Sequence, residues 1–289
     1  MMRRYTGLLL SLPAMILLSL LFLYPIFFNF HMSLYKLNLY VSPERYFVGF
    51  DNYIRVVSDP VFWNAFKNTA VFTVFSVLIE FVLGFFLALL LSRIRERWIN
   101  VLTAVCLIPM FLSEVTEGLI GQFMFATRIG LFNVLIQRLF NMQIPFLSDK
   151  TLALWSIILV DAWKMFPYFL VIFLAAIISI PRELVEAMSL DGATQWQQVR
   201  YLIIPYMIPV FCIAVLIRAI DAFTKVFGVV WMMTGGGPGL ATDVIPLRIF
   251  NLALRAFTWG IAATWGVFAF LVSLVLVGVY IYVSRRWSS

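Results

Sequence analysis

The chain has 289 residues, of which 63% are hydrophobic and only 12% charged, and its mean hydropathy is +0.98. One soluble core cannot bury so much apolar surface, so the composition excludes an ordinary soluble protein and indicates an integral membrane protein in a lipid bilayer. The formal net charge of +7 fits the Lys and Arg residues that orient membrane spans, so we expect no nucleic acid partner.

Six apolar segments reach or approach the length of roughly 20 residues that a helix needs to cross the ~30 Å hydrocarbon layer. They cover about residues 7–31, 69–91, 101–125, 151–178, 204–233 and 260–283. The first follows Arg3 and Arg4 but ends without a small-residue cleavage pattern, so we interpret it as an uncleaved anchor. No linker or repeat divides the chain, which predicts an all-α membrane protein, a six-helix bundle forming one domain over residues 1–289.

Lysine and arginine residues in the loops predict the orientation of the spans, because short cytoplasmic loops carry an excess of these residues. Each side of the predicted bundle holds nine of them. They are denser on the side that contains both termini, residues 92–100 and a polar loop at about residues 181–203. We therefore expect a multi-pass protein whose termini and polar loop lie in the cytoplasm.

The third predicted span contains Pro109, which interrupts a helix, so we expect a broken span there with Glu114 and Glu117 close to its external end. Two nearby carboxylates can serve an enzyme as acid and base. However, His31 is the only histidine, so the sequence offers neither a Ser-His-Asp set nor metal-ligand spacing. We expect no catalytic residues and no metal site.

The loop that follows, at about residues 128–150, has a leucine at every fourth position of its first half: Leu131, Leu135 and Leu139. This spacing places the three side chains on one side of a helix. A short apolar helix of this kind predicts an element that lies at the membrane interface.

The most strongly patterned polar segment is Glu183–Pro205, between the fourth and fifth spans. Apolar residues at i, i+3 and i+4 from Leu184 predict a short amphipathic helix. Gly192 can take the left-handed conformation that ends a helix, and Thr194 with Gln197 three residues later completes a capping-box pattern for a second helix. Such an element suits docking into a groove on a partner protein.

The run Gly235-Gly236-Gly237-Pro238 follows the fifth span and predicts a sharp turn, because three glycines and a proline cannot continue a helix. A phosphate-binding P-loop would require a Lys after the glycines, and none follows. No other Walker pattern occurs in the sequence. If the protein uses ATP, another chain must bind it.

The polar segment resembles the EAA loop of permease subunits of binding-protein-dependent ABC importers. That pattern reads E-A-A, three residues, G, nine residues, then I-x-L-P. The matching positions here are Glu186, Ala187, Gly192, the nine-residue spacer Ala193–Tyr201 and Pro205. The departures are Met188 for the second alanine, Leu202 for isoleucine and Ile204 for leucine.

Two further stretches, residues 47–53 (FVGFDNY) and residues 234–238 (TGGGP), resemble the carbohydrate branch of the family, of the maltose and glycerol-3-phosphate importer type. The resemblance implies the six-helix bundle of an ABC importer permease in the inner membrane of a prokaryote. It implies half of a translocation pathway for a sugar or related polyol. The alternative is a secondary transporter or channel that acts without an ATPase, which would show transport by the purified chain alone.

The resemblance also implies the partners. These are a second permease subunit, more often a different chain than a second copy in the sugar branch, two copies of a cytoplasmic ATPase and an external solute-binding protein. It implies no cofactor on this chain, since ATP and Mg would bind to the ATPase subunits. The residues expected to couple this chain to the ATPase are Glu186, Ala187, Met188, Asp191 and Gly192.

Charged residues inside the fourth and fifth spans are costly at membrane depth, so they usually face a cavity or one another. Asp161 and Lys164 share one helix face, as do Arg218, Asp221 and Lys225. Two interpretations stay open: structural ion pairing, or a lining for the translocation pathway, to which Glu80, Glu114 and Glu117 could contribute. The candidate pathway residues are Asp161, Trp163, Lys164, Asp221, Phe223, Lys225 and Trp231.

Overall fold

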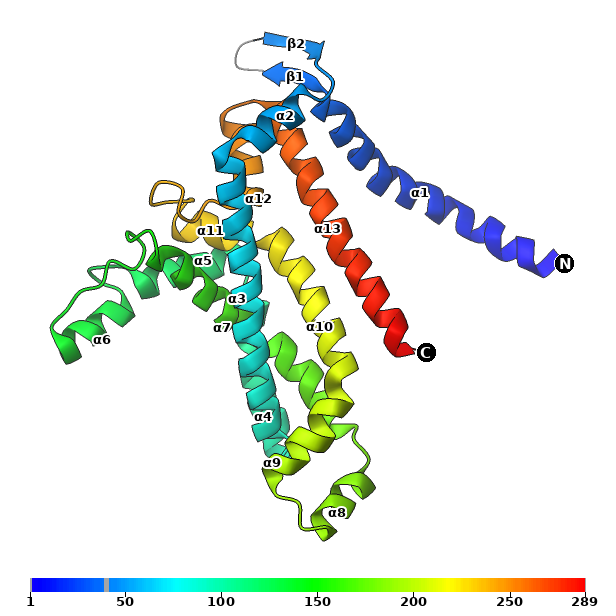
Figure 1. Ribbon diagram of the computed structural model, residues 1–289, viewed down its shortest axis with the longest axis vertical. Coiled ribbons are helices and arrows are strands. Elements are labelled where there is room, and N and C mark those ends of the chain that lie inside the picture. The colour runs from blue at the N-terminus through cyan, green and yellow to red at the C-terminus, as the bar shows by residue number, and fades with distance from the viewer. Residues whose placement is uncertain (1, 39–41, 289) are drawn as a thin grey trace. The chain divides into compact units, whose positions relative to one another are not determined.

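The computed structural model describes residues 2–38 and 42–288, and most of them are helical (Figure 1). The residues group into two compact units. Unit 1 contains Met1–Trp63 and Arg248–Leu271, and unit 2 contains Asn64–Leu247 and Val272–Ser289. The all-α class is confirmed, with a two-stranded hairpin that the sequence did not predict, while the single domain stays a prediction.

Unit 1 is built around the end of the first long helix, α1 (Met2–Ser33). The chain then forms an antiparallel hairpin of β1 (Tyr35–Asn38) and β2 (Ser42–Phe47) and the short helix α2 (Asp51–Ser58). The buried Asn52 side chain donates from Nδ2 to the carbonyl oxygens of Ser33 at 2.8 Å and Tyr35 at 3.0 Å. These bonds tie α2 to the end of α1.

Among the described residues, five helical segments are long and apolar enough to cross a membrane: Ser11–Ser33, Pro60–Leu91, Leu152–Ile178, Gln195–Lys225 and Trp259–Arg285. The remaining predicted span is broken, as expected from Pro109. Its halves meet at 95°, so the described residues hold up to six spans if this pair counts as one. The elements of the broken span are α4 (Glu96–Leu107), the 3-10 turn η1 (Ile108–Phe111) and α5 (Glu114–Phe125).

The core of unit 2 forms where α3 (Pro60–Leu91), α7 (Leu152–Ile178) and α10 (Ile204–Lys225) meet. Phe81 of α3 lies edge-on to the rings of Phe173 of α7 and Phe211 of α10, with centroid distances of 5.2 and 5.0 Å. Each such aromatic pair adds about 0.5–1.5 kcal/mol beyond burial. A Cβ at Gly84 would lie 2.5 Å from Cβ of Phe169, so only glycine permits this approach of α3 to α7.

Local capping fixes where α7 begins. Asp149 Oδ1 accepts from the backbone N–H groups of Thr151 at 2.8 Å and Leu152 at 2.9 Å. These two bonds favour the carboxylate and hold the pKa of Asp149 below its ordinary value. The helix therefore starts at the residue where its first orphan N–H groups find an acceptor.

The remaining elements are short helices between the long ones. In the sequence, α6 (Leu131–Phe140) precedes α7. After α7 come α8 (Arg182–Leu190), α9 (Gln195–Gln198) and the π-helical turn η2 (Val199–Ile203), which continues into α10 without a break. The chain continues through α11 (Phe227–Met233), α12 (Ile245–Phe250), the π-helical turn η3 (Asn251–Arg255) and α13 (Trp259–Ser288).

Candidate functional site

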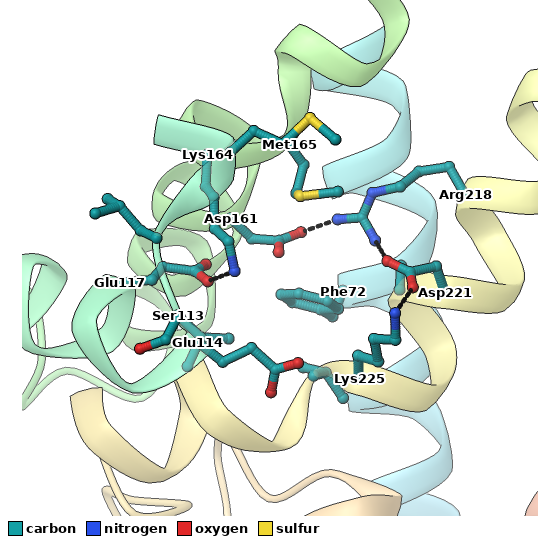
Figure 2. A pocket seen from close by; sticks show the side chains of 15 residues that line it. Phe72, Ser113, Glu114, Glu117, Asp161, Lys164, Met165, Arg218, Asp221 and Lys225 are labelled. Carbon is teal, nitrogen blue, oxygen red and sulfur yellow. Dashed lines mark hydrogen bonds and ion pairs between the residues drawn. The ribbon is translucent and has the colours of Figure 1, made fainter. Parts of the chain in front are cut away.

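A cavity of about 310 Å³ lies within unit 2, between the broken span, α7 and α10 (Figure 2). Its polar lining consists of Ser113, Glu114, Glu117, Asp161, Lys164, Arg218, Asp221 and Lys225. Its apolar lining consists of Phe72, Met110, Leu112, Met165, Ala222, Val226 and Val229. An open cavity that carries both charged and apolar side chains thus lies between largely apolar helices.

Arg218 of α10 is the centre of an ion-pair network. Its Nε and Nη2 donate to Oε2 and Oε1 of Glu80 on α3 at 2.8 and 2.9 Å, in a forked geometry. Its Nη2 also reaches Asp161 Oδ2 on α7 at 2.6 Å, and Nη1 reaches Asp221 Oδ2 at 3.1 Å. One guanidinium therefore links three helices, a role that its planar set of donors allows and a lysine ammonium does not.

A second pair joins α7 to the broken span. Lys164 Nζ donates to Glu117 Oε2 at 2.6 Å, and both side chains are buried. The other carboxylate oxygen of Glu117, Oε1, is buried without a hydrogen-bond partner among the described residues. A buried acceptor without a hydrogen-bond donor lowers the stability of the fold. A donor that reached Oε1 of Glu117 would therefore form a favourable hydrogen bond.

Burial divides the network into an inner and an outer part. The side chains of Glu80 and Arg218 are 0% and 3% exposed, whereas Asp221 is 27% and Lys225 65% exposed. Lys225 Nζ lies 2.5 Å from Oδ1 of Asp221, which is one turn earlier on α10. The inner ions link helices α3, α7 and α10, and the outer pair leaves charged groups accessible at the cavity.

The structure brings together four of the seven candidate pathway residues. Asp161, Lys164, Asp221 and Lys225 all line the cavity. The three aromatic candidates lie outside its lining: Trp163 is exposed on another side of α7, Phe223 is buried in the core, and Trp231 of α11 stacks on Phe227 at 5.8 Å. A helix turns about 100° per residue, which is why residues two positions from an aspartate face away from it.

The charges pair within α10 and also between helices, as the ion-pairing interpretation expects, although the sequence does not name the partners of the charges on α7. Asp161 pairs with Arg218 and Lys164 with Glu117, each on another helix, rather than with one another. A polar stripe also runs along α3, and only Glu80 of this stripe is among the residues considered from the sequence. Its buried members recur at i, i+4, i+7 and i+11 on one helix face: Thr69, Thr73, Ser76 and Glu80. This periodicity in the sequence predicts a polar face on α3.

The polar segment forms the predicted helix, turn and second helix. Gly192 has φ +76°, in the left-handed region. The N–H of Ala193 donates to the carbonyl of Met188 at 3.0 Å and that of Gly192 to Ser189 at 3.1 Å, which completes a Schellman motif at the end of α8. The capping box is confirmed, because Thr194 N donates to Gln197 Oε1 at 2.7 Å and Gln197 N to Thr194 Oγ1 at 3.4 Å.

Within α8 no residue is buried, so the segment expected to couple the chain to an ATPase stands free of the rest of unit 2. Glu186, Ala187, Asp191 and Gly192 are exposed and Met188 is partly buried. A short amphipathic helix with no buried residue gains little from tertiary packing within its own chain. Its sharply defined ends are thus the main features that fix its shape.

Comparison with known proteins decides the family. Residues 80–289 match the family described as "Binding-protein-dependent transport system inner membrane component". The chain belongs to this family. The permease is 32% identical to the trehalose/maltose transport system permease protein MalF of Thermococcus litoralis over 280 residues, which covers 96% of this chain and 93% of the relative. It is 31% identical over 283 residues to the sulfoquinovosyl glycerol transport system permease protein SmoG of Agrobacterium fabrum, covering 98% and 91%.

The fold has a counterpart among solved structures. The permease superposes on a chain of a bacterial ABC transporter involved in the import of the acidic polysaccharide alginate, with a TM-score of 0.84, 25% identity and coverage of 99% of this chain and 98% of the other. A second structure of an alginate transporter, in complex with an alginate pentasaccharide-bound periplasmic protein, has the same TM-score and covers 99% of this chain and 96% of the other. The permease is therefore an inner-membrane component of a binding-protein-dependent transport system, with the fold of an ABC transporter permease.

Proposed function

We propose that this permease carries a sugar or related polyol and that the cavity around Asp221 and Lys225 is part of its translocation pathway. The observation that carries the proposal is the outer ion pair. Asp221 and Lys225 line the cavity and remain partly exposed, while Arg218 and its buried partners fix the helices behind them. Hydroxyl groups of a sugar can both donate to Asp221 and accept from Lys225, and contacts that are few and partly hydrated permit release.

We propose in addition that α8 and the turn at Gly192 contact a cytoplasmic ATPase. Glu186, Ala187, Met188, Asp191 and Gly192 would form this coupling contact, with Glu186 facing a basic group of the partner. The exposure of Glu186 and the matched spacing of the loop support this proposal. In this arrangement both termini are cytoplasmic, two ATPase copies hold ATP and Mg, and a second permease, a different chain, supplies the other half of the pathway.

The test of the cavity compares one variant inside it with one outside. Uptake is measured in proteoliposomes of the assembled importer with its binding protein, using trehalose, maltose, sulfoquinovosyl glycerol and alginate oligosaccharides as probes. Hydrogen bonds to charged groups contribute about 1.5–3 kcal/mol, so Asp221→Asn should lower kcat/KM for the transported sugar by about 10- to 100-fold. Trp163→Phe, outside the cavity, should leave it unchanged.

Two results would count against the proposal. Wild-type uptake by a normally assembled Asp221→Asn importer would remove this cavity from the pathway, whereas the family assignment would stand. Failure of the wild-type importer to transport any of the four sugars would instead contradict sugar import by this site.

A further inference from the structure

The short helix α6 exposes an apolar face that nothing in unit 2 covers. Leu131, Leu135 and Leu139 are 55%, 47% and 74% exposed. Their four-residue spacing places them along one side of the helix. On a helix that faced water, this outward side would carry polar residues.

The opposite side of α6 is anchored, so the leucines cannot turn inward. Asn133 is buried, and its Nδ2 donates to the carbonyl oxygens of Ala126 at 3.3 Å and Ile144 at 2.8 Å. Its Oδ1 accepts from the N–H of Ile144 at 2.8 Å, and the neighbouring ring of Phe132 lies 4.7 Å from that of Phe125 at the end of α5. This contact fixes the rotation of α6 about its own axis.

The length of α6 limits what its apolar face can do. Its 10 residues extend about 15 Å at 1.5 Å per residue, which is half of the ~30 Å hydrocarbon layer, so α6 cannot cross the membrane. An apolar helix of this length is either a buried core helix or an interfacial one. Because its leucines are exposed, α6 is not a core helix of this chain, which favours the interfacial arrangement.

The surroundings of α6 favour lipid as the occupant. The helix connects α5, the second half of the bent pair, to the long apolar helix α7, and exposed apolar side chains occur on both, among them Phe123 of α5 and Leu159 of α7. The leucines of α6 are thus part of a series of exposed apolar side chains that includes residues of both neighbouring helices. Residues 128–150 carry Arg128, Arg138 and Lys150 but one acidic residue, Asp149, a balance that suits phosphate-containing headgroups.

We propose that α6 lies in the plane of the membrane, at the boundary between headgroups and acyl chains. Leu131, Leu135 and Leu139 enter the acyl region. Arg138 is exposed and stands one turn from Leu135, so its long side chain can reach past them to the lipid phosphates. The helix then anchors the loop that joins the broken span to α7, independently of which solute the permease carries.

Nitroxide labels on opposite sides of α6 test the proposal in the full chain, purified with its co-purifying subunits and placed in lipid nanodiscs. The free Cys106 and Cys212 are replaced by alanine, and a single label is attached at Leu135→Cys or at the control position Gln137→Cys. Residues two apart on a helix point to opposite sides. Oxygen concentrates in lipid and a water-soluble nickel chelate in the aqueous phase, so we expect oxygen to relax the label at 135 several-fold more than nickel does, and the reverse at 137.

Three outcomes would overturn the proposal. A label at 135 that nickel reaches as easily as at 137 would place the face in water. Protection of 135 from both reagents would show that another subunit covers it, and protection that appears only with added binding protein would make it that protein's docking surface. Leu139→Cys, on the same face and the most exposed of the three leucines, replaces Leu135→Cys if the latter fails to assemble.

Discussion

Arg218 shows how one residue can make a charged cluster tolerable inside an apolar bundle. A buried ion pays a desolvation penalty of several kcal/mol, which only close pairing and complete hydrogen bonding offset. Four hydrogen bonds from Arg218 reach Glu80, Asp161 and Asp221. Removing the guanidinium would leave Glu80 buried without its partner.

We predict that Arg218→Met lowers the free energy of unfolding by about 3–5 kcal/mol, since breaking a buried ion pair from one side has about this effect. Lys225→Met, a change of the same type on the same helix, should lower it by less than about 1 kcal/mol, because partly exposed pairs contribute little. Chemical unfolding in detergent, followed by tryptophan fluorescence, measures both values.

A rescue separates unpaired charge from lost packing. Adding Glu80→Gln and Asp161→Asn to Arg218→Met removes two stranded carboxylates and should restore part of the lost stability. No recovery would mean that the arginine stabilises the bundle by filling space rather than by neutralising its partners.

At the scale of elements, the turn behind α8 depends on the conformation of one residue. Gly192 has φ +76°, and a Cβ built on it meets no heavy atom within 4 Å. A side chain at this position would therefore meet no steric clash. Glycine is favoured here because an ordinary L-residue in the left-handed region carries backbone strain of roughly 1–2 kcal/mol.

We predict that Gly192→Val lowers the number of sugar molecules carried per ATP hydrolysed by at least about tenfold, a loss of roughly 1.4 kcal/mol in coupling, because a β-branched residue disfavours this turn. Gly192→Asn should retain most coupling, since asparagine tolerates the left-handed region. Parallel assays of uptake and ATP hydrolysis on the assembled importer give this ratio. Equal ratios in both variants and the wild type would remove the turn from the coupling contact.

Local features of this permease could be predicted from the sequence and distant contacts could not. The broken span at Pro109, the turn at Gly192 and the capping box at Thr194 follow from chemistry within a few residues. The pairing of Arg218 with Glu80 joins residues 138 positions apart, and helical periodicity states which face a charge occupies but not which helix meets that face. For the same reason the aromatic residues Trp163 and Phe223 could not be placed relative to the cavity.

At the scale of the whole molecule, we expect ATP hydrolysis to take place on a different subunit from this one. The sequence contains no Walker pattern, and the family is one of transport permeases. We predict that the purified chain in proteoliposomes carries none of the four probe sugars, with or without ATP, and that uptake appears only when its ATPase and permease partners are present. Uptake by the chain alone, driven by an ion or sugar gradient, would establish a secondary transporter or channel instead.

The uninterrupted helix from Gln195 to Lys225 joins the exposed turn to the cavity. It contains 31 residues, which corresponds to roughly 46 Å at 1.5 Å per residue. A rod of this length acts as a lever: a tilt of about 5° about one end displaces the other by roughly 4 Å. The π-helical turn at Val199–Ile203 lies at the end of this helix next to Thr194. Arg218, Asp221 and Lys225 lie near the other end. A small tilt produced at the Thr194 end, too small to unpack any helix, would therefore move the outer ion pair by more than the length of a hydrogen bond.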